Sequence, residues 1–183
     1  EALLETVASV AGSVPRVSIS DGIEPRKIAA AEGEHREAGT ADPHVWLDPT
    51  NVMVWVENAR AALTRLDPGG ADHYAANAAA YQAELEELDA WIRSEVERIP
   101  SENRELVTDH DNLGYFAARY GFTLVGAVIP AYSTLAQPSA RELTELEQTI
   151  AHYDVPALFV GVAVNPALSE RVARDMGVAL VPL

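Results

Sequence analysis

Residues 105–129, ELVTDHDNLGYFAARYGFTLVGAVI, decide the fold of this chain. The short apolar run at 106–108 predicts a strand, and residues 113–120 have the composition and spacing of a helix. Gly121 suits the left-handed position that ends such a helix, and residues 122–129 form a second apolar run. A strand, a helix and a strand in this order predict a parallel pair of strands joined by a helical crossover.

The same alternation continues to the end of the chain. A helix at 138–152, a strand at 157–160, a helix at 166–176 and a strand at 178–183 are expected in turn. Repeated alternation of this kind predicts an α/β fold with a parallel, doubly wound sheet. Ligands bind such sheets beyond the carboxyl ends of the strands, so residues that directly follow a strand are the first candidates for a site.

Before residue 105 the pattern is helical. Apolar residues recur on one stripe at Tyr81, Leu85, Leu88, Ile92, Val96 and Ile99. They predict a single helix over residues 71–99, roughly 45 Å long at 1.5 Å per residue, which is enough to span two lobes. Another helix is expected at 49–66, with Asp48 as its cap and Pro49 in its first turn.

The first part of the chain carries weaker signals. Residues 1–13 look like the end of a helix, and residues 14–20 alternate like a short strand. Residues 24–43 are rich in Ala, Glu and Gly without periodicity, so we expect an exposed loop there. The opening helix and the closing strand both look cut, and we expect functional neighbours beyond the two ends.

Composition excludes several classes of function. The formal net charge is −15, so the chain lacks the basic surplus that phosphate contacts require, and no nucleic-acid partner is expected. The absence of cysteine excludes disulfides and thiolate metal ligands. No stretch approaches the ~20 apolar residues of a membrane span. An acidic surface is compatible with collecting cations, although solubility alone would also explain it.

His44 is the first candidate metal ligand. It lies in the segment 42–49, DPHVWLDP, where two prolines fix the backbone and Asp42 and Asp48 flank the imidazole. A rigid loop that projects an imidazole between two carboxylates suits a metal ligand with supporting partners. The alternative is a helix-capping turn that contains an incidental histidine. Trp46 and Leu47 are expected to anchor the segment in the core.

His110 is the second candidate. It follows the strand at 106–108, between Asp109 and Asp111, where sites of α/β proteins form. The alternative is that these two acids only cap the next helix. His35, in the loop at 24–43, could take up metal transiently, although a solvated loop histidine is the more common case.

Enzyme motifs are missing. The chain has no His-Glu-x-x-His, no Gly-x-Ser-x-Gly and no phosphate-binding glycine loop, and no carboxylates pair at a recognisable acid/base spacing. We therefore predict no catalytic residues and no enzyme. A metal-dependent hydrolase, which would need an open coordination position and a nearby base, is the less favoured alternative.

Taken together, several segments resemble the cluster A-I solute-binding proteins of metal-transporting ABC systems, the ZnuA-like group, and within it the AztC type. The segment DPHVWLDP at 42–49 is similar to the family's most recognisable motif, and TDHDNLGYF at 108–116 is similar to the second. PSAREL at 138–143, Phe159-Val160 and Val164-Asn165-Pro166 match the segments that follow. The matches appear in family order and cover nearly the whole chain.

The resemblance implies two α/β lobes, each a parallel-type sheet flanked by helices, joined by one long rigid helix. Residues 1–70 would form the C-terminal part of an N-lobe that is only partly present. Residues 71–99 would be the linker helix, and residues 100–183 a C-lobe that is incomplete at its end. The loop at 24–43 corresponds to the family's His-rich metal loop, but it holds only His35.

The resemblance also implies a site of four ligands: two histidines from the first lobe, and a His or Glu and an Asp from the second. His44 matches the second ligand and His110 the third, while the others are expected before residue 1 and after Leu183. Manganese-binding relatives tend to carry Glu where this chain has His110, so Zn²⁺ is the implied metal, with manganese or iron as the alternative.

The implied function is that of a periplasmic zinc-binding protein, with its signal peptide outside these 183 residues. It would act as a monomer and deliver Zn²⁺ to the membrane permease of an ABC transporter. A periplasmic zinc metallochaperone is a second candidate partner.

Overall fold

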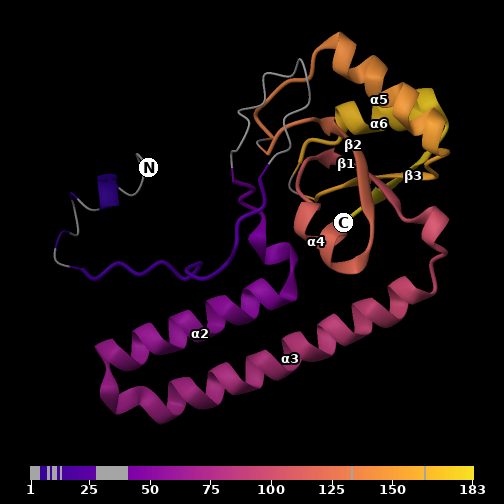
Figure 1. The fold of residues 1–183 in the computed structure, drawn as a ribbon. Helices are drawn as coiled ribbons and strands as arrows, with labels where there is room; N and C mark the ends of the chain where they lie inside the picture. Colours follow the sequence, from indigo (N-terminus) through magenta and orange to yellow (C-terminus); the bar gives the residue numbers. More distant parts are fainter. Residues whose placement is uncertain are drawn as a thin grey trace.

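The structure is a computed structural model that describes residues 5–7, 9, 12, 14–27, 41–132, 134–162 and 164–183. A helical hairpin lies beneath a unit built on a sheet (Figure 1). In chain order the elements are the 3₁₀ turn η1 (Val45–Leu47), α2 (Pro49–Leu66), the 3₁₀ turn η2 (Pro68–Gly70), α3 (Ala71–Glu97), the 3₁₀ turn η3 (Ser101–Asn103), β1 (Glu105–His110), α4 (Gly114–Tyr120), β2 (Thr123–Ile129), α5 (Ala140–Tyr153), β3 (Ala157–Val160), α6 (Ala167–Met176) and β4 (Ala179–Pro182).

The predicted α/β fold with a parallel sheet is confirmed. The sheet has four strands in the order β2-β1-β3-β4, and every pair is parallel. The chain steps from β1 to β2 in one direction and builds β3 and β4 in the other. Because crossovers between parallel strands are right-handed, α4 covers one face and α5 and α6 cover the opposite face (Figure 1). The strand order therefore reverses between β1 and β3, and a ligand crevice is expected at their carboxyl ends.

The hydrophobic core fills the space between the sheet and the pair α5 and α6. Its buried members are Val107, Val128, Leu146, Ile150, Val155, Leu158 and Val172. Val107 and Leu158 face each other on the two central strands, and both are fully buried. Burying a side chain of this size contributes about 1.5–3 kcal/mol, so the central strands form a firm base for residues at their ends.

The helical hairpin consists of α2 and α3, which lie side by side (Figure 1). The predicted long helix is present, but it ends at Glu97 because Arg98 and Ile99 form tighter turns before Pro100. Only part of the predicted apolar stripe is buried among the described residues, where Leu85 and Val96 are covered and Tyr81 and Leu88 are exposed. None of the helices in the described part of the chain combines the length and the apolar character that crossing a membrane requires.

The strand predicted at 14–20 is wrong. Residues 14–20 are all exposed, and within the described ranges they pair with no strand. Instead, the amide of Asn58 donates to the backbone oxygens of Ile19 (2.8 Å) and Asp21 (2.9 Å), and the Trp55 indole donates to Ser20 (2.9 Å). A segment with alternating residues forms a strand only when a partner strand bonds its backbone. Here side chains of α2, and not a neighbouring strand, make the hydrogen bonds to this segment.

The predictions for the other N-terminal segments are tested only in part. Residues 5–7 and 9 are helical, as expected for the end of a helix. At the two ends of the predicted loop, Lys27 and Ala41 form a single antiparallel bridge. The middle of that loop, including His35, lies outside the described residues. The division into lobes at 70/71 and 99/100 stays a prediction.

Candidate metal site

The two candidate ligands, His44 and His110, meet in the structure. Their ring centroids are 5.3 Å apart with an angle of 70° between the planes. His44 directly precedes η1, and His110 is the last residue of β1, at the point where the strand order reverses. Both are buried, at 7% and 8% exposure. Two imidazoles on one tetrahedral zinc, with Zn–N bonds of about 2.0–2.1 Å, place their centroids about 5 Å apart, so this spacing fits a shared ion.

Each imidazole is held by a neighbouring carboxylate in the same way. Nδ1 of His44 lies 2.8 Å from Oδ1 of Asp42, and Nδ1 of His110 lies 2.8 Å from Oδ1 of Asp109. The same two oxygens accept the backbone N–H groups of His44 (2.9 Å) and His110 (2.7 Å). An ionised carboxylate only accepts, so each Nδ1 carries the hydrogen and each Nε2 keeps the lone pair that can bind a metal.

Asp109 is buried and ionised. Burial raises its pKa, but hydrogen bonds from the His110 ring and from the backbone N–H groups of Gly161 (2.9 Å) and His110 outweigh this effect, so the pKa lies below its ordinary value. Gly161 directly follows β3, which means that Asp109 joins the ends of the two central strands. A fixed negative charge beside His110 favours a cation at this ring.

The acids that flank each histidine are evident in the sequence, but which of them bonds the imidazole ring is not. Of the residues that flank His44, only Asp42 holds the ring; Asp48 caps α2 by accepting the Thr50 N–H at 2.8 Å. The segment therefore serves as a helix cap and also presents His44. Beside His110, Asp109 holds the ring, so the alternative in which these acids only cap the next helix does not account for Asp109.

Besides the His110 ring, the aromatic rings of Trp46 and Tyr132 lie beside His44. Trp46 lies edge-on at 5.4 Å between centroids and Tyr132 at 5.9 Å. Burial, followed by the charges of Asp42 and Asp111, raises the pKa of Tyr132 to about 12, so its hydroxyl is neutral at neutral pH. No motif indicated Tyr132, although its place after β2, at the same edge of the sheet, could have done so.

The prediction that Trp46 anchors the segment in the core is wrong. Its side chain is 48% exposed and lies against Trp55 at the surface, with 6.4 Å between the ring centroids. The burial of this segment comes instead from Asp42, His44 and Pro49. A tryptophan so close to His44 is a useful fluorescent reporter of the site.

The described residues bring two candidate metal ligands together. Within those ranges, no group of three His, Cys, Asp or Glu side chains could hold a metal ion. His73 and His152 are exposed on α3 and α5. His35 lies outside the described residues, and the two remaining ligands are expected outside residues 1–183. The assignment of His44 and His110 as ligands stays a prediction.

Comparison with known proteins places these features in a family. The model of the family "Zinc-uptake complex component A periplasmic", ZnuA, matches residues 1–183. The manganese-binding lipoprotein MntA of Halalkalibacterium halodurans is 34% identical over 97% of this chain and 56% of its own length. The zinc-binding protein TroA of Treponema pallidum is 34% identical over 93% of this chain and 53% of its own.

The fold agrees with this relationship. The match to a crystal structure of ZnuA covers 100% of this chain and 66% of the ZnuA chain, with a TM-score of 0.85 and 27% sequence identity. The chain spans about half the length of the two curated relatives. The predicted resemblance is thus confirmed, and with it the expectation that the fold is that of a binding protein rather than of an enzyme. The chain belongs to the ZnuA family of solute-binding proteins of metal ABC transporters.

Proposed function

We propose that this chain is the part of a periplasmic zinc-binding protein that supplies two of the metal ligands, Nε2 of His44 and Nε2 of His110. The observation that carries the proposal is the pair of buried rings with centroids 5.3 Å apart, each anchored through Nδ1 by a buried aspartate. An imidazole that is fixed in orientation and tautomer before the metal arrives binds with less loss of freedom.

Zinc is favoured by the chemistry of position 110. Imidazole nitrogen suits Zn²⁺, whereas carboxylate oxygen suits manganese, and both candidate ligands here are histidines. A manganese-binding or iron-binding protein is the second candidate. It is supported by the 34% identity to a manganese-binding lipoprotein, which equals the identity to the zinc-binding relative.

The proposed role is transport rather than catalysis. The two buried carboxylates beside the histidines, Asp42 and Asp109, are committed to the rings, so neither is free to act as a general base. The protein would collect Zn²⁺ in the periplasm, directly or from a metallochaperone, and deliver it as a monomer to the permease of an ABC transporter. The division into a partial N-lobe (1–70), a linker helix (71–99) and a C-lobe (100–183) belongs to the same proposal.

Titration of the full-length protein with Zn²⁺ and Mn²⁺ tests the assignment. Replacing either histidine, as His44→Ala or His110→Ala, should weaken zinc binding more than about 100-fold, beyond the range for residues that only support a ligand. His73→Ala and His152→Ala, at exposed histidines, are the matched controls and should bind as the parent does. Unchanged zinc affinity in both site variants would overturn the assignment.

The choice of metal has a test of its own. His110→Glu replaces a nitrogen ligand by oxygen and should shift the preference from Zn²⁺ towards Mn²⁺. Preference for Mn²⁺ in the parent protein would favour the second candidate. Because imidazole must be deprotonated to bind, zinc affinity should fall as the pH is lowered, and zinc uptake should release protons.

A further inference from the structure

Helix α4 contacts the His44 segment on both sides of the histidine. Two side chains of this helix, Tyr115 and Arg119, are four residues apart and therefore project from the same face. Tyr115 contacts Asp42, before His44, and Arg119 contacts Asp48, after it. We propose that Tyr115 and Arg119 are positioning residues that fix His44 relative to His110. The inference rests on the proposed function, in which both histidines bind the metal.

Tyr115 fixes the start of the segment. Its buried hydroxyl donates to the backbone oxygen of Asp42 (3.1 Å) and accepts the backbone N–H of Arg26 (2.9 Å). Asp42 is the residue whose carboxylate holds Nδ1 of His44. The preceding Gly114 allows this approach, since a Cβ there would lie 3.0 Å from Oδ2 of Asp42. A displacement of Tyr115 is thereby passed to the imidazole.

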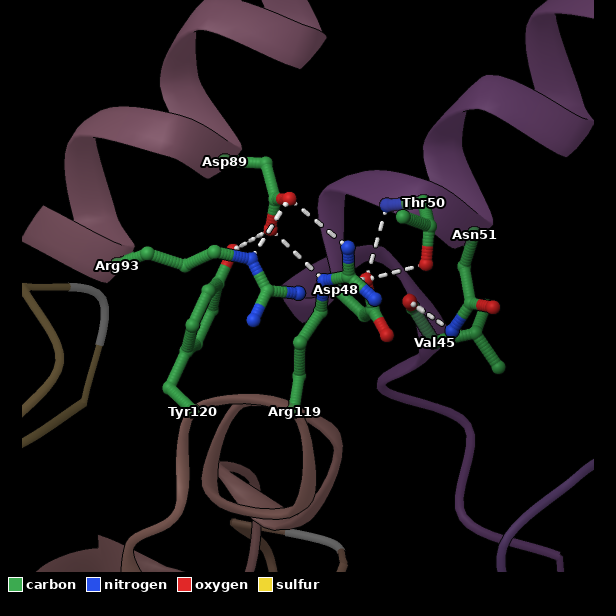
Figure 2. A network of polar contacts seen from close by, with 8 residues as sticks. All are labelled: Val45, Asp48, Thr50, Asn51, Asp89, Arg93, Arg119 and Tyr120. Atoms are coloured by element: carbon green, nitrogen blue, oxygen red, sulfur yellow. Dashed lines mark hydrogen bonds and ion pairs between the residues drawn. The ribbon is translucent and has the colours of Figure 1, made fainter.

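Arg119 fixes the end of the segment. Its Nε lies 3.2 Å from Oδ1 of Asp48, the oxygen that also accepts the N–H of Thr50 at the start of α2 (Figure 2). The three-residue turn η1 connects His44 directly to Asp48. Holding Asp48 therefore limits where His44 can move.

Asp89 of α3 holds Arg119 in this position. Nε and Nη2 of Arg119 donate to the two carboxylate oxygens of Asp89 at 2.8 and 2.9 Å. Tyr120 donates to the same carboxylate at 2.9 Å, and Arg93 at 3.1 Å (Figure 2). These two parallel hydrogen bonds from Arg119 to Asp89 form a bidentate pair. The planar guanidinium fixes the geometry of this pair, which the ammonium group of a lysine does not reproduce.

The arrangement couples two parts of the chain that sequence separates. His110 ends β1, and α4 follows after a short turn, so the second ligand and the two positioning residues belong to one packed unit. His44 lies outside that unit and is tied to it by Tyr115 and Arg119. Releasing either tie should let the His44 ring depart from its productive position without unfolding the protein, which lowers affinity through lost pre-organisation.

Two conservative variants of the full-length protein test the inference. Tyr115→Phe removes one hydroxyl group. Arg119→Lys removes the bidentate hydrogen bonds to Asp89 but keeps the positive charge. Tyr74→Phe and Arg60→Lys are matched controls far in sequence from the two candidate ligands. Tyr74 donates to Asp67 at 2.8 Å and the Arg60 guanidinium donates to Glu57, both in solvent-exposed hydrogen bonds of the hairpin. Three quantities are measured: the Zn²⁺ affinity by chelator competition, the visible spectrum of bound Co²⁺, and the NMR signals of the His44 ring without metal.

Tyr115→Phe and Arg119→Lys should each weaken Zn²⁺ binding about 10-fold, alter the Co²⁺ spectrum and shift the His44 ring signals, while the controls match the parent. A parent-like affinity, spectrum and ring signal in both variants would overturn the inference, and so would reduced stability with these three readouts unchanged. If His44→Ala weakens binding and these variants do not, only this inference fails. If His44→Ala has no effect, the proposed function fails.

Discussion

Replacing Asp89 by Asn should lower the free energy of unfolding in a pH-dependent way. The Asp89 side chain is only 16% exposed. Hydrogen bonds from Arg119 lower its pKa most; burial opposes this, and hydrogen bonds from Tyr120 and Arg93 add to it, so that the pKa falls from 3.8 to about 2. At 1.36 kcal/mol per pH unit, this difference corresponds to about 2 kcal/mol of stability at neutral pH.

The sign follows from the lowered pKa. The folded state holds the Asp89 carboxylate in its charged form more firmly than the unfolded state does. Its contribution is therefore complete above 3.8 and is lost as the pH falls towards about 2. Asp89→Asn should lower the midpoint of thermal unfolding by about 4–8 °C at neutral pH, since 1 kcal/mol shifts a chain of this size by about 2–4 °C.

Urea unfolding of the parent and of Asp89→Asn, followed by circular dichroism across this range of pH, measures the effect. The two stabilities should differ at neutral pH and converge as the pH falls through about 2. Glu57→Gln is the control, because the pKa of Glu57 is also lowered by an arginine but its side chain is half exposed, and solvent screens the pair. Equal stabilities at neutral pH, or a difference that persists in acid, would refute the role given to Asp89.

Three further substitutions probe the core, the site and a helix cap. Leu158→Ala should cost about 2–5 kcal/mol in urea unfolding because the side chain is fully buried, whereas Leu135→Ala, at 89% exposure, should stay within about 0.5 kcal/mol. Gly114→Ala adds a Cβ 3.0 Å from Oδ2 of Asp42 and should reduce both stability and Zn²⁺ affinity; parent-like values would mean that Asp42 can move aside. Ser139→Ala removes the cap of α5 and should cost about 1 kcal/mol, and an unchanged unfolding curve would contradict this role.

The elements of the sheet unit could be read from the sequence because their signals are local. Apolar runs and helical spacing located every strand and helix from residue 105 onwards, with small differences at their ends. Gly121, at φ +75°, ends α4 as expected, and Gly177, at φ +69°, ends α6 in the same way, since glycine adopts this backbone conformation without strain. His44 and His110 were candidates for a similar reason, each in a short segment with its own acids and turns.

Contacts between distant segments were decided only by the tertiary structure. Each histidine has two acids beside it in the sequence. In the folded chain Asp42 and Asp109 bond the histidine rings, whereas Asp48 forms an ion pair with Arg119. The failed strand at 14–20 has the same cause, because alternation describes the side chains of a segment and says nothing about whether a partner strand lies beside it. Spacing along the chain determines which groups can point the same way; which of them meet depends on how helices and strands far apart in sequence pack together.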